Sequence, residues 1–399
     1  MYYNDFKELK LSGLGMGNMR LPVLDNDSSK INEELAGKML AFCLENGINY
    51  FDTAYPYHGG NSETAIGKSL SRYPRESWYL ADKFPGHQNV PGITPLDPEE
   101  VFEAQLKKCG VTYFDFYLLH NVNENSMRYY LNPENGCIDY FLKQREDGRI
   151  RHLGFSCHAA PDSLEVFLSQ YGDKMEFCQI QLNYLDWTLQ DAKRKCEILR
   201  QAEIPIWVME PVRGGRLASF DAETEARLRA LRQEESIPAW AFRWLQTVPK
   251  PTMVLSGMSN LQQMEDNIKT FSEEKPLNEQ ELELIREVSN GIARLIPCTG
   301  CRYCCAGCPK GIDIPKLLSM ANDLTVYRSF NVVMRYSAIE ENKRADACIG
   351  CGQCSRACPQ KINVPEELAK LADVIKEQKS WEEICRERAE AAAKQKENK

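Results

Sequence analysis

This 399-residue sequence lacks three features, and each absence excludes a class of protein. No run of hydrophobic residues approaches the length of about 18 that a membrane-spanning helix needs. The N-terminal stretch MYYNDFKELKLSG has neither the basic start nor the apolar run of a signal peptide. No block rich in Lys and Arg is present, and the net charge of -8 and pI of about 5.5 argue against a nucleic-acid partner. We therefore expect a cytoplasmic protein that binds neither membranes nor nucleic acids.

A fourth absence concerns the fold. The glycine fingerprint GxGxxG, which marks the dinucleotide site of an open doubly wound sheet, does not follow the first apolar run, so the open sheet is the less favoured alternative. Short apolar runs alternate with amphipathic stretches through about residue 270, which is typical of repeated strand–helix units. Eight such units predict an α/β fold, a parallel (β/α)8 TIM barrel over residues 1–285. The eight candidate strands are 11–17, 48–51, 78–81, 114–119, 150–155, 177–182, 204–209 and 252–256.

Nine of the sixteen cysteines fall in two short windows after the predicted barrel, CTGCRYCCAGCP (298–309) and CIGCGQCSRACP (348–359). Both fit CxxCxxCxxxCP, the bacterial ferredoxin spacing in which three thiolates wrap one 4Fe-4S cluster and the fourth reaches the other cluster. A structural zinc site usually uses two separated CxxC pairs, so the third and fourth thiols of these windows would have no role as ligands. Cys305 is outside the pattern, as a bystander or an alternative ligand. The predicted ligands of two clusters are Cys298, Cys301, Cys304 and Cys358, and Cys348, Cys351, Cys354 and Cys308.

The linker between the windows is long for a compact ferredoxin. Residues Asp313 to Glu341 have a helical pattern, so residues 286–375 resemble the α-helical ferredoxins with two clusters. Residues 376–399 are rich in Ala, Glu, Lys and Arg and predict a charged C-terminal helix exposed to solvent.

Four predicted strands end on polar residues: Asp52, Lys83, His120 and Ser156. Because the carboxyl ends of barrel strands meet at one face, these side chains predict a shared active site. The motifs FDTAYPY, ADKF and YLLHN, together with GMGNMRLP, GRIRHLGFS and SGMSNLQQMEDN, resemble the aldo-keto reductase family. With the added clusters, the chain resembles the iron-sulfur-containing branch of that family found in many anaerobes.

The resemblance implies a catalytic tetrad of Asp52, Tyr57, Lys83 and His120. Tyr57 would give a proton to the carbonyl oxygen of a small carbonyl or alcohol substrate, and the Lys83 ammonium would lower the pKa of that phenol. Asp52 would hold Lys83, and His120 would orient the substrate oxygen. Tyr55 is the competing phenol, two residues earlier. Trp187 and Tyr130 are candidate aromatic walls of the pocket.

The resemblance also implies a nicotinamide cofactor. Ser156, Gln179 and Asn183 would hold the carboxamide, although Cys157 stands where the family has Asn. Met209 stands at the position that packs on the nicotinamide, and the loop that begins at Ser256, with the start of the following helix, would hold phosphate. The remaining predicted cofactor contacts are Gly17, Asn18 and Met19 after the first strand, and Ser256, Gly257, Met258, Gln263, Asp266 and Asn267 in and after the phosphate loop. Gly257 and Gln263 stand where relatives that use NADPH place Lys and Arg, so NAD(H) is expected at least as strongly as NADP(H). No motif supports a flavin, although a barrel can bind the phosphate of a flavin without one.

A hydride carries two electrons and a 4Fe-4S cluster passes one, so we do not expect direct exchange between nicotinamide and cluster without a flavin or a radical-stabilising substrate. Three hypotheses for the role of the clusters remain. The clusters relay electrons between the barrel and a ferredoxin or flavoprotein, or they only stabilise an ordinary carbonyl reductase, or the chain is a non-enzymatic electron carrier or redox sensor. The complete tetrad argues against the third hypothesis, and the presence of two clusters favours the relay.

Overall fold

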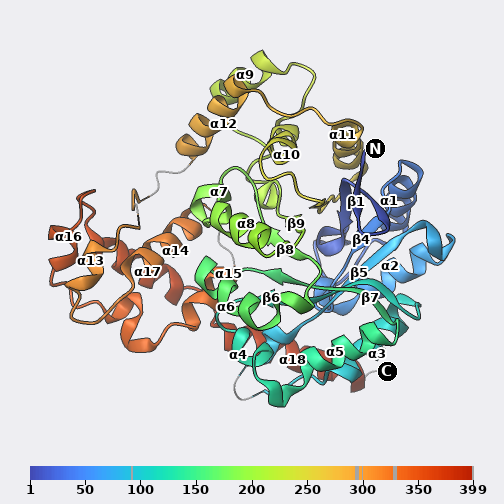
Figure 1. The fold of residues 1–399 in the computed structure, drawn as a ribbon, viewed down its shortest axis with the longest axis horizontal. Coiled ribbons are helices and arrows are strands. Elements are labelled where there is room, and N and C mark those ends of the chain that lie inside the picture. Colours follow the sequence, from blue (N-terminus) through green and yellow to red (C-terminus); the bar gives the residue numbers. More distant parts are fainter. Residues whose placement is uncertain (91–92, 293–295, 299, 327–329, 398–399) are drawn as a thin grey trace. The chain divides into compact units, whose positions relative to one another are not determined.

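The computed structural model describes residues 1–90, 93–292, 296–298, 300–326 and 330–397. It divides the chain into two compact units. The first contains Met1–Asn89 and Thr94–Arg286, and the second contains Glu287–Lys399 together with the short segment Val90–Ile93 (Figure 1). Among the described residues, none of the helices combines the length and the apolar character that crossing a lipid bilayer requires.

The first unit is a closed barrel of eight parallel strands, which confirms the predicted fold class. Each strand pairs with its neighbours in chain order, and the last strand pairs with the first to close the barrel. Because every strand is covered on both faces, its side chains are almost all buried. The strands are β3 (Leu14–Gly17), β4 (Tyr50–Asp52), β5 (Tyr79–Phe84), β6 (Phe114–Val122), β7 (Ile150–Cys157), β8 (Cys178–Gln181), β9 (Ile206–Met209) and β10 (Met253–Ser256).

Helices follow the strands around the barrel, and several have clear local start and stop signals. Asp97 caps the helix after β5 by accepting a hydrogen bond from the Glu100 N–H at 2.9 Å, and Gly110 ends that helix with a φ of 65°. The helices are α1 (Glu33–Glu45), α2 (Ser62–Leu70), α3 (Pro98–Cys109), α4 (Met127–Tyr130), α5 (Cys137–Glu146), α6 (Pro161–Tyr171), α7 (Asp186–Leu189), α8 (Ala192–Gln201), α9 (Ala222–Leu231), α10 (Ile237–Thr247), α11 (Leu261–Phe271) and α12 (Glu279–Ile292).

An N-terminal hairpin that the sequence did not predict precedes the barrel. It pairs β1 (Tyr3–Phe6) with β2 (Leu9–Ser12), so only part of the predicted strand 11–17 belongs to the barrel sheet. Phe6 is 3% exposed and its ring contacts that of Trp207 edge to face, with centroids 4.9 Å apart. The hairpin thereby adds a buried aromatic side chain to the barrel core.

The second unit is helical, as predicted. The predicted helix from Asp313 to Glu341 is present as two helices, and positions 327–329 between them lie outside the described residues. Each cysteine window starts a similar piece of chain, with a short helix followed by a 13-residue helix, and these two long helices pack together. The helices are α13 (Tyr303–Ala306), α14 (Ile314–Val326), α15 (Phe330–Ser337), α16 (Gln353–Arg356), α17 (Val364–Lys376) and α18 (Trp381–Glu397).

The C-terminal helix α18 differs from the expected solvent-exposed tail. Its first residue, Trp381, is 2% exposed and lies in a hydrophobic cluster with Met334 and Val90. The start of α18 is therefore part of the packed unit. Burying the large apolar surface of the Trp381 indole is favourable, even though most of the residues around it in the sequence are charged.

Candidate functional site

Three of the four predicted tetrad residues lie at the carboxyl ends of adjacent barrel strands. Asp52 ends β4, Lys83 lies one residue before the end of β5, and His120 lies near the end of β6. The Lys83 Nζ is 2.5 Å from the Asp52 Oδ1 and also donates a hydrogen bond to the Thr53 carbonyl at 2.7 Å. Lys83 and Asp52 are 0% and 3% exposed, so this is a buried ion pair.

Tyr57 completes the group from the turn after β4, the 3₁₀ segment Tyr57–Gly60. The Lys83 Nζ is 5.1 Å from the centre of the Tyr57 ring, and the His120 ring is 5.9 Å from it in an edge-to-face arrangement. The competing phenol, Tyr55, instead lies 5.0 Å from the ammonium of Lys108. The cluster therefore contains Tyr57 and not Tyr55.

Electrostatics at this cluster favour a neutral phenol beside a charged amine. Burial raises the pKa of Tyr57 above its ordinary value, and the nearby Lys83 offsets only part of this rise. Lys83 thus acts on the pKa of Tyr57 in the expected direction, but desolvation has the larger effect and the net pKa is raised. Burial alone would lower the pKa of Lys83, but Asp52 and Tyr57 outweigh it, and the net pKa is raised.

A second histidine that sequence reasoning missed lies beside the cluster. His87 is on the 3₁₀ segment Gly86–Gln88 after β5, is 5% exposed, and has its ring centre 4.6 Å from that of His120. Its position four residues after Lys83, in the loop that leaves β5, is the only sequence signal that could have identified it. Tyr130, expected as a pocket wall, is 2% exposed and donates a hydrogen bond to the His120 carbonyl at 2.8 Å.

Two of the residues predicted to bind a nicotinamide carboxamide lie side by side. Ser156 on β7 is in register with Gln179 on β8, and both are buried. The Ser156 Oγ accepts a hydrogen bond from the Asn121 N–H at 2.8 Å. The Gln179 Oε1 is buried and has no hydrogen-bond partner among the described residues. An unpaired buried acceptor at this position fits the amide N–H of a carboxamide.

Asn183, the third predicted carboxamide contact, is not available. Its Oδ1 accepts hydrogen bonds from the N–H groups of Leu185 and Asp186, and its Nδ2 donates to the Asp186 carboxylate and the Glu210 carbonyl. An amide side chain has no further strong hydrogen-bonding capacity beyond these four bonds. The prediction for Asn183 is therefore wrong, because the turn after β8 uses the whole side chain.

The predicted contacts near the first strand divide into buried and exposed residues. Gly17 ends β3, and the buried Asn18 donates a hydrogen bond from its Nδ2 to the Asp52 carbonyl at 2.9 Å. Met19 is 60% exposed. Met209, the residue predicted to pack on the nicotinamide, ends β9 and is half-buried.

The predicted phosphate loop after β10 is held by its own side chains. Gln263 accepts a hydrogen bond from the Ser259 N–H at 2.8 Å. Asn267 donates to the Ser256 Oγ at 3.0 Å, and Asp266 accepts from Ser236 at 2.5 Å. Met258 is 1% exposed, whereas Gly257 is exposed. Gly257 is thus open to a ligand.

Arg20 lies against the open face of Gly257. A Cβ added to Gly257 would be 3.5 Å from the Cβ, Cγ and Cδ atoms of Arg20, and the Ser259 hydroxyl donates a hydrogen bond to the Arg20 carbonyl at 2.8 Å. Arg20 is exposed, and among the described residues its guanidinium forms no ion pair or hydrogen bond. The positive charge of Arg20, which follows β3, therefore lies beside the loop after β10, which contains no positively charged residue.

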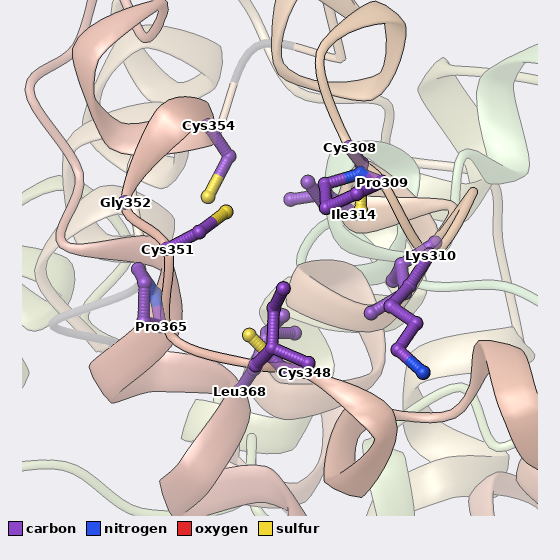
Figure 2. A pocket seen from close by; sticks show the side chains of 12 residues that line it. Cys308, Pro309, Lys310, Ile314, Cys348, Cys351, Gly352, Cys354, Pro365 and Leu368 are labelled. Carbon is purple, nitrogen blue, oxygen red and sulfur yellow. The ribbon is translucent and has the colours of Figure 1, made fainter.

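The second unit contains two cavities surrounded by cysteines, each combining three thiols of one window with the last thiol of the other. Both cavities open to solvent, and the empty volume including that open space is about 340 Å³ for one and about 320 Å³ for the other. Figure 2 shows the labelled cysteines of the first cavity around one central space. Cys305 lines neither cavity. The cysteines are Cys308, Cys348, Cys351 and Cys354 around the first cavity, and Cys298, Cys301, Cys304 and Cys358 around the second.

The arrangement of these thiols fits a cluster better than a single ion. In the part of the chain that the structure describes, no group of three or more Cys, His, Asp or Glu is placed to hold a metal ion. Zinc would require all its sulfur ligands within about 2.3 Å of one point. Four thiols around one space, backed by apolar residues such as Ile312, Ile314 and Leu368, instead suit an iron-sulfur cluster with its soft thiolate ligands.

Comparison with known proteins gives the same division of the chain. The aldo/keto reductase family matches residues 13–290, and the 4Fe-4S dicluster domain matches residues 297–363. The NADH-specific methylglyoxal reductase of Escherichia coli K12 is 22% identical in an alignment 330 residues long that covers 72% of this chain and 97% of that protein. The structure of an aldo-keto reductase from Bacillus halodurans in its holo form is 23% identical, with a TM-score of 0.56 over 72% of this chain and 96% of that one. An aldo-keto reductase from Klebsiella pneumoniae in complex with NADPH is 15% identical, with a TM-score of 0.55 and the same coverage.

Proposed function

The chain belongs to the aldo/keto reductase family, and we propose that it is an oxidoreductase that interconverts a small carbonyl compound and its alcohol with a nicotinamide cofactor. The observation that carries this proposal is the grouping of Tyr57, Lys83, Asp52 and His120 at one end of the barrel. The C-terminal 4Fe-4S dicluster domain adds iron-sulfur chemistry to the same chain.

Each member of the tetrad has a task that its surroundings support. Tyr57 holds the proton that the carbonyl oxygen receives, because its raised pKa keeps the phenol protonated at neutral pH. Lys83 remains an ammonium and stabilises negative charge that develops on the Tyr57 oxygen. Asp52 fixes Lys83, and His120, beside the Tyr57 ring, orients the substrate oxygen.

The nicotinamide, when bound, supplies the hydride for the carbonyl carbon. Gln179 and Ser156 would hold its carboxamide, since the Gln179 Oε1 is a buried acceptor that lacks a partner. Both NAD(H) and NADP(H) are compatible with these contacts. Arg20 beside Gly257 provides a cation for a phosphate of the dinucleotide, which restores support for NADP(H) that Gly257 and Gln263 alone do not give.

The two cysteine-lined cavities would each hold one 4Fe-4S cluster. The thiolate donors, the crossed sets of four and the apolar lining all suit this cofactor. Each cluster, when present, passes one electron at a time. Cys301 and Cys351, one on each cavity, are exposed, so electrons can be exchanged with an external carrier such as a ferredoxin or flavoprotein. We include this relay in the proposal; purely structural clusters are its alternative.

The barrel reaction is tested by following NADH and NADPH absorbance during incubation with a panel of aldehydes and ketones. The panel begins with α-oxoaldehydes, because a relative of this chain is named a methylglyoxal reductase. Oxidation of the cofactor that depends on the carbonyl is expected. Its absence with every carbonyl and both cofactors would contradict the proposal.

The relay is tested on protein purified without oxygen, after iron counting and a flavin assay. Clusters reduced with dithionite are expected to be reoxidised when the barrel substrate is added. The relay is wrong if the clusters stay reduced while a Cys351→Ala variant that has lost its cluster turns over normally with NADH. Loss of folding in that variant would favour the structural alternative.

A further inference from the structure

His87 is buried beside the active-site histidine and has no task in the proposed reaction. Its ring meets the His120 ring at an interplanar angle of 73°, with centroids 4.6 Å apart. The Tyr57 ring meets His120 at 82°. The His120 ring thus contacts two other rings, and each contact is of the edge-to-face type that aromatic groups favour.

The backbone around both histidines is fixed by one tyrosine. The Tyr130 hydroxyl lies 2.8 Å from the His120 carbonyl and 3.1 Å from that of Phe84. The Tyr130 ring also packs so closely on Gly86 that a Cβ there would lie 2.5 Å from a ring carbon. Any larger residue before His87 would therefore displace the Tyr130 ring, and the loop that carries His87 is held against the strand end that carries His120.

These contacts place a limit on the orientation of His120. A side chain that orients a substrate must be held within a narrow range of positions, and an error of about 1 Å can reduce a rate by roughly 100-fold. The hydrogen bond from Tyr130 fixes only the backbone of His120. Its imidazole also contacts two rings, of which the Tyr57 ring belongs to the tetrad and the His87 ring does not.

We propose that His87 is a positioning residue, which holds the imidazole of His120 in the orientation that faces Tyr57 and the substrate oxygen. The expected effect on kcat rests on the proposed function. The claim that His87 orients the His120 imidazole does not. Removing the His87 ring removes one of the ring contacts that restrict the rotation of the His120 side chain, whereas a different flat ring at position 87 retains that contact.

The test compares three variants in the full chain, purified without oxygen. His87→Ala is expected to lower kcat for carbonyl reduction by about tenfold and to leave the KM for the nicotinamide unchanged, because His120 contacts the substrate and not the cofactor. His87→Phe is expected to restore kcat to within about threefold of the unmodified protein, since the ring contact returns. His152→Ala is the matched control, because His152 is also 5% exposed and also contacts a ring edge to face, that of Phe6 at 5.1 Å.

A second measurement does not depend on turnover. The chain has five histidines, so their imidazole signals can be assigned by NMR of protein labelled at histidine. The His120 signal is expected to move and broaden in His87→Ala, and to move little in His87→Phe and His152→Ala. If the unmodified protein reduces no carbonyl, the proposed function fails, and this signal still decides the role of His87.

An unchanged kcat and an unchanged His120 signal in a folded His87→Ala variant would overturn the inference. An equal loss of kcat in His152→Ala would also overturn it, since the effect would then be general destabilisation. If His87→Ala does not fold, His87→Asn replaces it, with the same expected loss and the same rescue by phenylalanine.

Discussion

The ammonium of Lys83 lies 2.5 Å from the carboxylate of Asp52, and both groups are almost completely buried. A buried ion pair costs desolvation energy that its own attraction only partly recovers, so its value for stability is small. Its value here is positional, since it places a permanent positive charge beside the Tyr57 phenol.

Replacing Lys83 by methionine leaves the Asp52 carboxylate buried without its partner. The free energy of unfolding is expected to fall by about 3–5 kcal/mol, and a second change, Asp52→Asn, is expected to recover part of it. Urea unfolding followed by tryptophan fluorescence measures both effects. Lys38→Met is the control, since its ion pair with Glu34 is exposed and is expected to matter by less than about 0.5 kcal/mol.

Removing the hydroxyl group is expected to lower kcat at Tyr57 and to have little effect on kcat at Tyr55. Tyr57→Phe removes the proton donor and is expected to lower kcat for carbonyl reduction by about 100- to 10,000-fold. Tyr55→Phe is the matched change, because Tyr55 contacts Lys108 and not the tetrad, and its kcat is expected to stay within about twofold of the original. Steady-state kinetics decide, and equal losses in the two variants would show that the tetrad is misassigned.

The pH profile follows from the raised pKa of Tyr57. Burial keeps the phenol protonated beyond its ordinary pKa of 10.0, so kcat for carbonyl reduction is expected to stay level up to about pH 10 and to decline only above it. Alcohol oxidation needs the phenolate as a base and is expected to rise through the same range. A decline in reduction that is centred well below pH 10 and disappears in Tyr57→Phe would contradict this direction.

Arg20 is expected to affect cofactor binding through its charge. Arg20→Met keeps an unbranched stem and removes the guanidinium, which is expected to weaken NADPH binding by about 10- to 100-fold. Calorimetry with NADPH and NADH separates two cases: loss for NADPH alone indicates the 2′-phosphate, and equal losses indicate the pyrophosphate. Arg72→Met, at an exposed position after α2, is the control. Unchanged binding of both cofactors would remove Arg20 from the cofactor site.

The crossed cysteine sets predict which variants damage the same cluster. Cys308→Ala and Cys351→Ala are expected to abolish the same electron paramagnetic resonance signal, although the two residues belong to different windows. Cys358→Ala and Cys301→Ala are expected to share the other signal. Cys305→Ala is the control and is expected to keep about eight iron atoms per chain. Loss of one signal by both Cys308→Ala and Cys301→Ala would show that each window holds its own cluster.

Local patterns explain why much of the fold was predictable. The alternation of apolar runs and amphipathic stretches predicted the barrel, and the polar residues Asp52, Lys83 and His120 were predicted to converge because parallel strand ends share one face. The cysteine windows were recognisable because ligand spacing in an iron-sulfur loop is itself a local property.

The features that were missed depend on contacts distant in sequence. Phe6 joins the barrel core across about 200 residues from Trp207, and Val90 belongs to the same compact unit as Trp381. Neither relationship has a sequence signal. Asn183 was misassigned because spacing does not show that its amide is already used by the turn after β8.

The central claim is that the barrel site transfers hydride to a carbonyl carbon and that Tyr57 delivers the accompanying proton. The most direct measurement supplies a nicotinamide deuterated at C4 with a carbonyl substrate, without oxygen, and analyses the alcohol by mass spectrometry. Deuterium on the carbinol carbon is expected with the unmodified chain, together with a loss of at least about 100-fold in Tyr57→Phe. Alcohol formed without deuterium, or formed as fast by the Tyr57→Phe variant, would contradict the claim.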